Sequence, residues 1–126
     1  GYAMSRIKVL VVEDDAKLRR TLVQLLMLES DLTVIGEVGN GERALAEAAI
    51  LGPDVVLTDI EMPLLDGIEL TREIRRRMPN TQVVILTKFG DDERVFAALK
   101  AGALGYVLKD SGLDELSRAI RSAHIG

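Results

Sequence analysis

Short apolar runs alternate with longer amphipathic segments along the chain. Runs rich in Val, Ile and Leu, such as IKVLVV, have the length and β-branched content of buried strands. The pattern predicts strands at residues 7–12, 32–38, 54–59, 82–87 and 105–109. Between them, apolar residues recur at helical spacing. This spacing predicts helices at residues 15–29, 42–51, 67–78, 91–101 and 113–124, the last opened by a capping-box-like Ser111-x-x-Asp114.

The regular alternation of strand and helix predicts an α/β fold, in which helices cover both faces of a parallel sheet. The strands agree with this prediction, because a strand that is covered on both faces is apolar almost throughout. In such sheets the ligand binds beyond the carboxyl ends of the strands. The residues that end the predicted strands should therefore meet in one site.

Composition narrows the class of protein. The 126 residues fit one domain, and 48% hydrophobic residues with only 3% aromatic ones predict an aliphatic core. The lack of cysteine excludes disulfides and thiolate metal sites. There is no signal-peptide pattern, and no apolar run approaches the roughly 20 residues of a membrane span, so we expect a soluble, cytoplasmic domain without membrane contact.

The net charge and the N-terminal residues lead to two expectations, one about nucleic acid and one about the bounds of the domain. The net charge of −4 provides no electrostatic footprint for nucleic acid on this segment. Gly1, Tyr2 and Ala3 precede Met4 and resemble the remnant of an expression tag, so residues 1–4 are excluded from fold reasoning and the domain is expected to span residues 5–126.

Polar residues with distinctive chemistry end four of the predicted strands. They are Glu13-Asp14-Asp15 after the first strand, Asp59 at the end of the third, Thr87-Lys88 at the fourth and Lys109 at the fifth. Acids that lie together repel unless a cation intervenes. Carboxylate oxygens without His or Cys favour a hard ion such as Mg²⁺, and Lys109 offers a second positive charge.

This combination suits phosphoryl chemistry. Asp59 could attack phosphorus and become an acyl phosphate, while Mg²⁺, Lys109 and Thr87 bind the phosphoryl oxygens. Catalysis would then consist mainly of positioning and charge neutralisation. Each acid alone could equally be a solvated turn residue. The combination of acids with Lys109 and Thr87 favours a functional site.

Four motifs in chain order make the sequence similar to the receiver domain of two-component response regulators, from Ser5 onward. They are Glu13-Asp14, TDIEMPLLDG around Asp59, Thr87, and GYVLKD with Tyr106 and Lys109. The resemblance implies a flavodoxin-like (βα)5 fold, a doubly wound parallel sheet of five strands in the order 2-1-3-4-5.

The resemblance also implies roles for the acids. Asp59 would be the phosphoacceptor. Mg²⁺ would be bound by Asp14, by Asp59 and by the backbone carbonyl of Glu61, with Glu13 acting on the metal through water. The phosphoryl group would come from a histidine of a sensor kinase or from a small acyl phosphate.

Three further residues would respond to phosphorylation. Lys109 would pair with the phosphoryl group, Thr87 would swing toward it, and Tyr106 would follow inward. One departure from the family pattern is Lys88, which follows Thr87 where a small residue is usual. The helix at 91–101 and the loop before it are the expected moving parts.

The segments TDIEMP, GYVLKDS and ELSRAIRSA are most similar to receivers of the NarL/FixJ (LuxR-type) group. In that group a C-terminal helix-turn-helix follows the receiver, and some members form homodimers through the first and last helices. DNA would then be bound only by a domain beyond Gly126. The first predicted helix agrees with this mode, because Ala16, Val23 and Met27, with Arg20, lie opposite its core face. Scattered exposed apolar residues are the alternative.

Three other functions compete with a transcription factor. A stand-alone receiver would act through protein–protein contacts, and like any receiver it would catalyse only its own phosphorylation and dephosphorylation. An Mg²⁺-dependent aspartyl phosphohydrolase of the haloacid dehalogenase type needs Asp-x-Asp after the first strand and usually a cap. A flavodoxin-like nucleotide or flavin module needs a Gly/Ser/Thr-rich phosphate loop there, but acids occupy that position.

Overall fold

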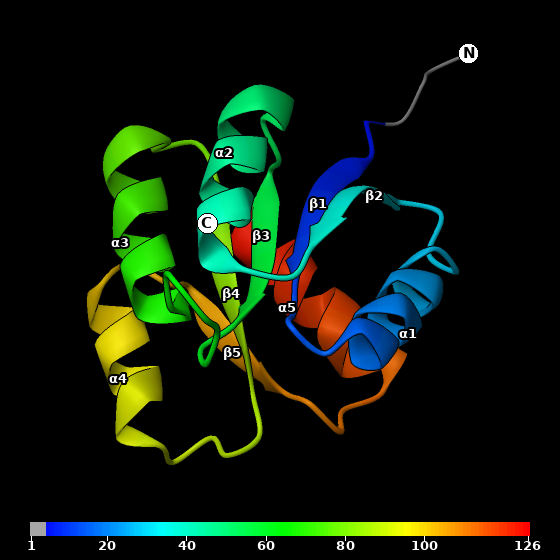
Figure 1. Ribbon diagram of the computed structural model, residues 1–126. Coiled ribbons are helices and arrows are strands. Elements are labelled where there is room, and N and C mark those ends of the chain that lie inside the picture. Colours follow the sequence, from blue (N-terminus) through cyan, green and yellow to red (C-terminus); the bar gives the residue numbers. More distant parts are fainter. Residues whose placement is uncertain (1–4) are drawn as a thin grey trace.

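The computed structural model describes residues 5–126, in which strands and helices alternate along the chain (Figure 1). The strands are β1 (Ile7–Val12), β2 (Leu32–Val38), β3 (Val55–Asp59), β4 (Gln82–Thr87) and β5 (Gly105–Leu108). The helices are α1 (Ala16–Leu26), α2 (Gly41–Leu51), α3 (Gly67–Arg77), α4 (Glu93–Lys100) and α5 (Leu113–Ile125). The expected tag remnant and start methionine, residues 1–4, lie outside the described residues.

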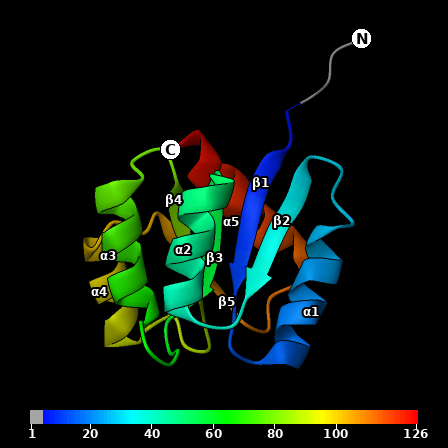
Figure 2. The same cartoon turned by 45° about the horizontal axis from the view of Figure 1, so that its top comes forward.

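The strands form one parallel sheet in the order β2-β1-β3-β4-β5, so the predicted fold is confirmed. Helices α1 and α5 cover one face, and α2, α3 and α4 cover the other (Figures 1 and 2). This arrangement follows from the apolar strands, because each must bury both of its faces. All carboxyl ends point to the same edge of the sheet.

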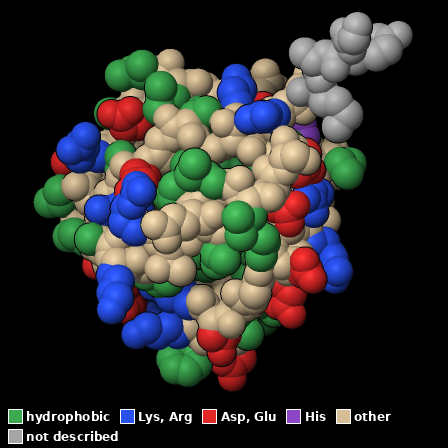
Figure 3. All heavy atoms as spheres, turned by 90° about the vertical axis from the view of Figure 1, so that its right-hand side faces the viewer, with side chains coloured by type: hydrophobic (Ala, Val, Ile, Leu, Met, Phe, Trp, Pro, Cys, Tyr) green, Lys and Arg blue, Asp and Glu red, His purple; other side chains and the backbone are tan. Residues whose placement is uncertain are grey.

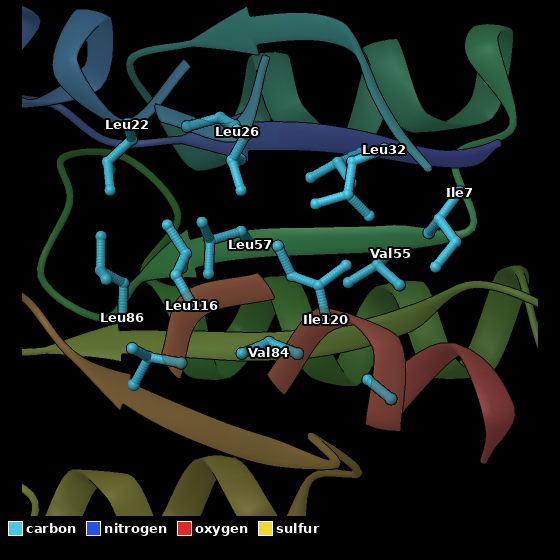
Figure 4. Close-up of a cluster of buried hydrophobic side chains, with 14 of the residues drawn as sticks. Ile7, Leu22, Leu26, Leu32, Val55, Leu57, Val84, Leu86, Leu116 and Ile120 are labelled. Atoms are coloured by element: carbon cyan, nitrogen blue, oxygen red, sulfur yellow. The ribbon is translucent and has the colours of Figure 1, made fainter. Parts of the chain in front are cut away.

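Two aliphatic cores fill the space between the sheet and its helices. Alternate strand residues point to opposite faces, so Leu57 packs under α1 and α5, whereas its neighbour Val56 packs under α2, α3 and α4. Figure 4 shows Leu22 and Leu26 of α1 and Ile120 of α5 around the first of these cores. These packed layers hold the central strands rigidly, and with them the residues at the strand ends.

Two helices start later than predicted because a side chain caps each of them. Helix α1 begins after Asp15, whose carboxylate accepts hydrogen bonds from the first turn, and α4 begins after Asp92 for the same reason. The predicted capping box of the last helix is wrong, because Gly112 occupies the N-cap and no side chain caps the helix. No helix within residues 5–126 combines the length and the hydropathy that crossing a membrane requires.

The apolar stripe predicted on the outer face of α1 is wrong at Val23. This side chain is only 5% exposed and belongs to the core, because α1 packs against the edge strand β2 as well as against α5. Ala16, Arg20 and Met27 are exposed as predicted. Figure 3 views the α1–β2 side of the molecule, where hydrophobic side chains lie in small groups among charged ones.

Candidate functional site

An open cavity of about 540 Å³ lies at the carboxyl edge of the sheet. Its walls come from the ends of four strands and from the loops that follow them. The predicted site residues Glu13, Asp14, Asp59, Glu61, Thr87 and Lys109 all line it. The parallel topology brings them together, since residues up to 96 positions apart in sequence follow the carboxyl ends of strands in one sheet.

Lys109 joins the two buried acids of the cavity. Its Nζ lies 2.8 Å from Glu13 Oε1 and 2.9 Å from Asp59 Oδ2. Glu13 is fully buried and Asp59 is 6% exposed. Removing two carboxylates from water is costly unless a cation pairs with them, and the ammonium of Lys109 provides that pairing.

Burial and charge perturb both members of this cluster. Burial raises the pKa of Glu13 above its ordinary value; the charge of Asp59 adds to the rise, and the hydrogen bonds from Lys109 and the Asp15 backbone only partly offset it. For Lys109, burial opposes the charged form. The bonds to Glu13 and Asp59 outweigh burial and raise the pKa of Lys109, so its ammonium stays charged at neutral pH.

The donor atoms of the cavity fit a small, hard cation. Glu13, Asp14 and Asp59 each offer a carboxylate oxygen, and these three atoms lie within 4.8 Å of one another. The set contains oxygen donors only, which suits Mg²⁺ better than a transition metal. Asp14 is exposed to the cavity mouth, whereas Glu13 and Asp59 form its buried floor.

The loop after β3 fixes the position of Asp59. Its Oδ1 accepts a hydrogen bond of 2.7 Å from the backbone N–H of Ile60, and the Gly67 N–H returns to the Ile60 carbonyl at 2.8 Å. A Cβ at Gly67 would lie 2.2 Å from the Asp59 carbonyl oxygen. Glycine at this position therefore allows α3 to begin directly against the end of β3.

Thr87 lines the cavity with its hydroxyl beside the Phe89 backbone, whereas Tyr106 lies outside the cavity. The buried Thr87 hydroxyl lies 3.4 Å from both the N–H and the carbonyl oxygen of Phe89. Tyr106 is 44% exposed, and its ring lies against Gly90, where a Cβ would approach Tyr106 Cε2 to 2.9 Å. Of the predicted site residues, Tyr106 is the one that does not line the cavity.

Sequence reasoning missed Arg94 at the rim of the cavity. Arg94 forms ion pairs with Glu61 of the β3–α3 loop and, at 2.7 Å, with Asp92. Its hydrogen bonds to Asp92 lower the pKa of that carboxyl to about 2. The available signal was an arginine in the first turn of a helix, where the helix dipole disfavours a cation and a local acid must compensate.

Comparisons with known proteins agree with this geometry. The family profile described as "Response regulator receiver domain" matches residues 9–121. The transcriptional regulatory protein LiaR of Bacillus subtilis is 40% identical over 120 residues, which are 95% of this chain and 57% of that protein. The transcriptional activator DevR/DosR of Mycobacterium tuberculosis is 41% identical, with coverage of 95% and 55%. The chain thus spans about half the length of the curated relatives it matches.

Solved structures extend the match to three dimensions. The signal receiver domain of the response regulator NarL from Mycobacterium tuberculosis superposes with a TM-score of 0.92 at 31% identity, covering 97% of this chain and 98% of that one. A LuxR-family DNA-binding response regulator from Staphylococcus aureus gives 0.87 at 32% identity, with coverage of 94% and 98%. The chain therefore belongs to the response regulator receiver domain family, and its homologues are response regulators of the LuxR/NarL type.

Proposed function

We propose that this domain accepts a phosphoryl group on Asp59 from a histidine of a sensor kinase, in an Mg²⁺-dependent reaction. One observation carries the proposal: the carboxylates of Glu13, Asp14 and Asp59 and the ammonium of Lys109 converge in one cavity. Such a cluster is unfavourable for folding by itself, so its presence favours a function. Small acyl phosphates are a second donor.

Asp14, Asp59 and the backbone carbonyl of Glu61 would hold the ion directly, and Glu13 would act on it through water. The bound ion supplies positive charge opposite the phosphoryl oxygens. Glu13 is fully buried and pairs with Lys109 at 2.8 Å, which suits an outer acid that orients its neighbours better than one that enters and leaves the site.

In the transfer, a carboxylate oxygen of Asp59 forms a bond to phosphorus while the bond from phosphorus to the donor histidine nitrogen breaks. The nitrogen keeps the electron pair of the broken bond. Lys109, already 2.9 Å from Asp59 Oδ2, stays beside the developing charge on the phosphoryl oxygens. The chain thus catalyses its own modification and turns over no separate substrate.

Phosphorylation would then switch the β4–α4 region. Phosphorylated side chains carry about −1.5 to −2 charge at neutral pH, and this charge attracts donors. The Thr87 hydroxyl, now beside the Phe89 backbone, would turn to the phosphoryl group, and Tyr106 would leave Gly90 and move inward. These contacts exist only in the phosphorylated state, so they bias the conformation of the loop and of α4.

In the full-length protein we propose that the switch controls transcription through a C-terminal helix-turn-helix domain that binds DNA. The names of the relatives LiaR and DevR/DosR, both transcriptional regulators, support this proposal. We propose homodimerisation through α1 and α5, with Ala16, Arg20 and Met27 on the exposed side of α1. A shift in size with beryllofluoride and Mg²⁺, measured by light scattering, is expected. A receiver that stays monomeric there would favour a stand-alone module.

The central experiment is incubation with acetyl phosphate and Mg²⁺, followed by intact mass measurement. We expect one phosphoryl group per chain, and we expect none in Asp59→Asn or in the presence of EDTA. Asp66→Asn is the matched control, because Asn can replace Asp66 as the N-cap of α3. Labelling that survives Asp59→Asn would refute the assignment. Multiple turnover on phosphoesters would favour the phosphohydrolase.

A further inference from the structure

Arg19 of α1 reaches back to the loop that carries two of the acids. Its Nη1 donates a hydrogen bond of 2.6 Å to the backbone carbonyl of Glu13. Its Nε lies 3.6 Å from Glu37 Oε1 of β2, and the two side chains are only 20% and 25% exposed. Arg19 therefore links three segments, α1, the β1–α1 loop and β2, at a partly buried position.

The fold makes room for this guanidinium. A Cβ at Gly39 would lie 3.1 Å from Arg19 Nη1, so the absence of a side chain there leaves the space that the arginine fills. On the other side, the N–H of Glu13 donates to the Val38 carbonyl at 3.1 Å. Both backbone groups of Glu13 are thus fixed, one by β2 and one by Arg19.

The fixed carbonyl belongs to the peptide unit that joins Glu13 to Asp14. Because a peptide unit is planar, fixing its carbonyl also fixes the direction in which the chain enters Asp14. The two carboxylates leave the backbone on either side of this unit, and both must reach the same small volume near Asp59. Partners that orient metal-binding groups typically change metal affinity 10–100-fold when they are removed.

We propose that Arg19 is a positioning residue that holds the Glu13–Asp14 peptide unit, and with it both carboxylates, in the geometry that binds a divalent cation. The inference rests on the proposed Mg²⁺ site and deepens it. It assigns a role to a residue that touches neither the cation nor the phosphoryl group.

The loss of a positive charge alone would change the Mg²⁺ affinity in the opposite direction. Deleting a positive charge near a cation site strengthens cation binding, whereas losing the orientation of two ligands weakens it. Arg20 provides the matched control. It pairs with the same Glu37 carboxylate at 2.5 Å, but its side chain is 58% exposed. Arg19→Ala and Arg20→Ala therefore remove the same charge and the same type of partner from Glu37.

The test is Mg²⁺ titration by isothermal calorimetry of the wild type and these two variants, each first shown to be folded by circular dichroism in EDTA. We expect Arg19→Ala to bind Mg²⁺ about tenfold more weakly than the wild type. Arg20→Ala should bind it as tightly as the wild type or more tightly. Wild-type or tighter affinity in Arg19→Ala, or equal weakening in both variants, would overturn the proposal.

A second pair keeps the charge and serves if an alanine variant does not fold. Lysine cannot hold the Glu13 carbonyl and face Glu37 with one planar group, so we expect Arg19→Lys to bind Mg²⁺ about threefold more weakly than Arg20→Lys. Equal affinities in this pair would also overturn the proposal.

Phosphorylation by acetyl phosphate separates positioning of the ion from damage to the acceptor. In Arg19→Ala, the Mg²⁺ concentration that gives half the maximal rate should rise with the change in affinity. The rate at saturating Mg²⁺ should approach that of the wild type. A lower saturating rate with an unchanged midpoint would contradict positioning. A wild type that binds no Mg²⁺ would refute the proposed function itself.

Discussion

Replacing Lys109 by methionine tests whether its ammonium makes the acidic cavity tolerable. Methionine keeps most of the apolar stem but loses the charge. The change removes two ion pairs, 2.8 Å to Glu13 and 2.9 Å to Asp59, and leaves both carboxylates in place. Because Glu13 is fully buried, its carboxylate then loses the positive charge that compensates its burial.

Removal of one partner from a buried ion pair typically costs about 3–5 kcal/mol, because the remaining charge is left unpaired. The side chain of Lys109 is 16% exposed and the cavity is open, so we expect the lower end, about 3 kcal/mol of unfolding free energy in EDTA at neutral pH.

The loss of unfolding free energy in Lys109→Met should also depend on pH, and in a defined direction. Burial already raises the folded-state pKa of Glu13, and Lys109 acts against that rise. A carboxyl with a raised folded pKa contributes stability that is full below its unfolded pKa and is lost as pH rises through the folded pKa. Without Lys109 the folded-state pKa of Glu13 rises further, so Glu13 becomes protonated at a higher pH. The cost of the substitution should therefore shrink as pH falls toward 4.5, because a protonated Glu13 no longer needs a cationic partner.

The assay is urea denaturation followed by circular dichroism, in EDTA and in Mg²⁺. A ligand at ten times its Kd adds about 1.4 kcal/mol to stability, and the variant should gain more than the wild type because its acids are unpaired. Lys88→Met is the control, since Lys88 is an exposed lysine on the same cavity. Equal losses in the two variants, or a Lys109→Met cost that does not change with pH, would refute the reasoning.

Three further predictions probe the contacts that stabilise the site and the fold around it. Gly67→Ala should destabilise the protein by at least about 2 kcal/mol and slow phosphorylation, because the new Cβ would meet the Asp59 carbonyl oxygen at 2.2 Å. Urea denaturation measures the first effect and intact mass the second, and wild-type values in both would contradict the close approach. Leu57→Ala should cost about 3 kcal/mol in urea melts while the folded fraction is still phosphorylated, because Leu57 is fully buried away from the cavity. Arg121→Met should remove most of the lowering of the Asp31 pKa, because the hydrogen bond from Arg121 is its largest cause. The stability that this pair contributes is present above the ordinary value of 3.8 and is lost as pH falls through the lowered folded value. Acid titrations of the two proteins should therefore converge at low pH.

Local errors of the sequence-based prediction arise where a contact outside the periodic pattern of a helix decides the outcome. The starts of α1 and α4 depend on which acid turns its side chain onto the first turn, and α5 begins after Gly112 with no side-chain cap. Helical spacing placed Val23 on the outer side of α1. Its burial depends on the neighbouring edge strand β2, which helical spacing within α1 does not describe.

The sequence by itself determined the layered α/β fold and which strand-end residues gather at the carboxyl edge of the sheet. Strands that are apolar throughout must be covered on both faces, and parallel strands carry their last residues to one edge, so Asp59, Thr87 and Lys109 had to meet there. Only the tertiary structure decided the contacts between elements. Arg19 on the Glu13 carbonyl depends on how α1 lies beside the sheet, and Tyr106 on Gly90 depends on a rotamer. The physical reason is that periodicity specifies which face a residue occupies, whereas a hydrogen bond requires atoms of separate elements to lie within about 3 Å of each other.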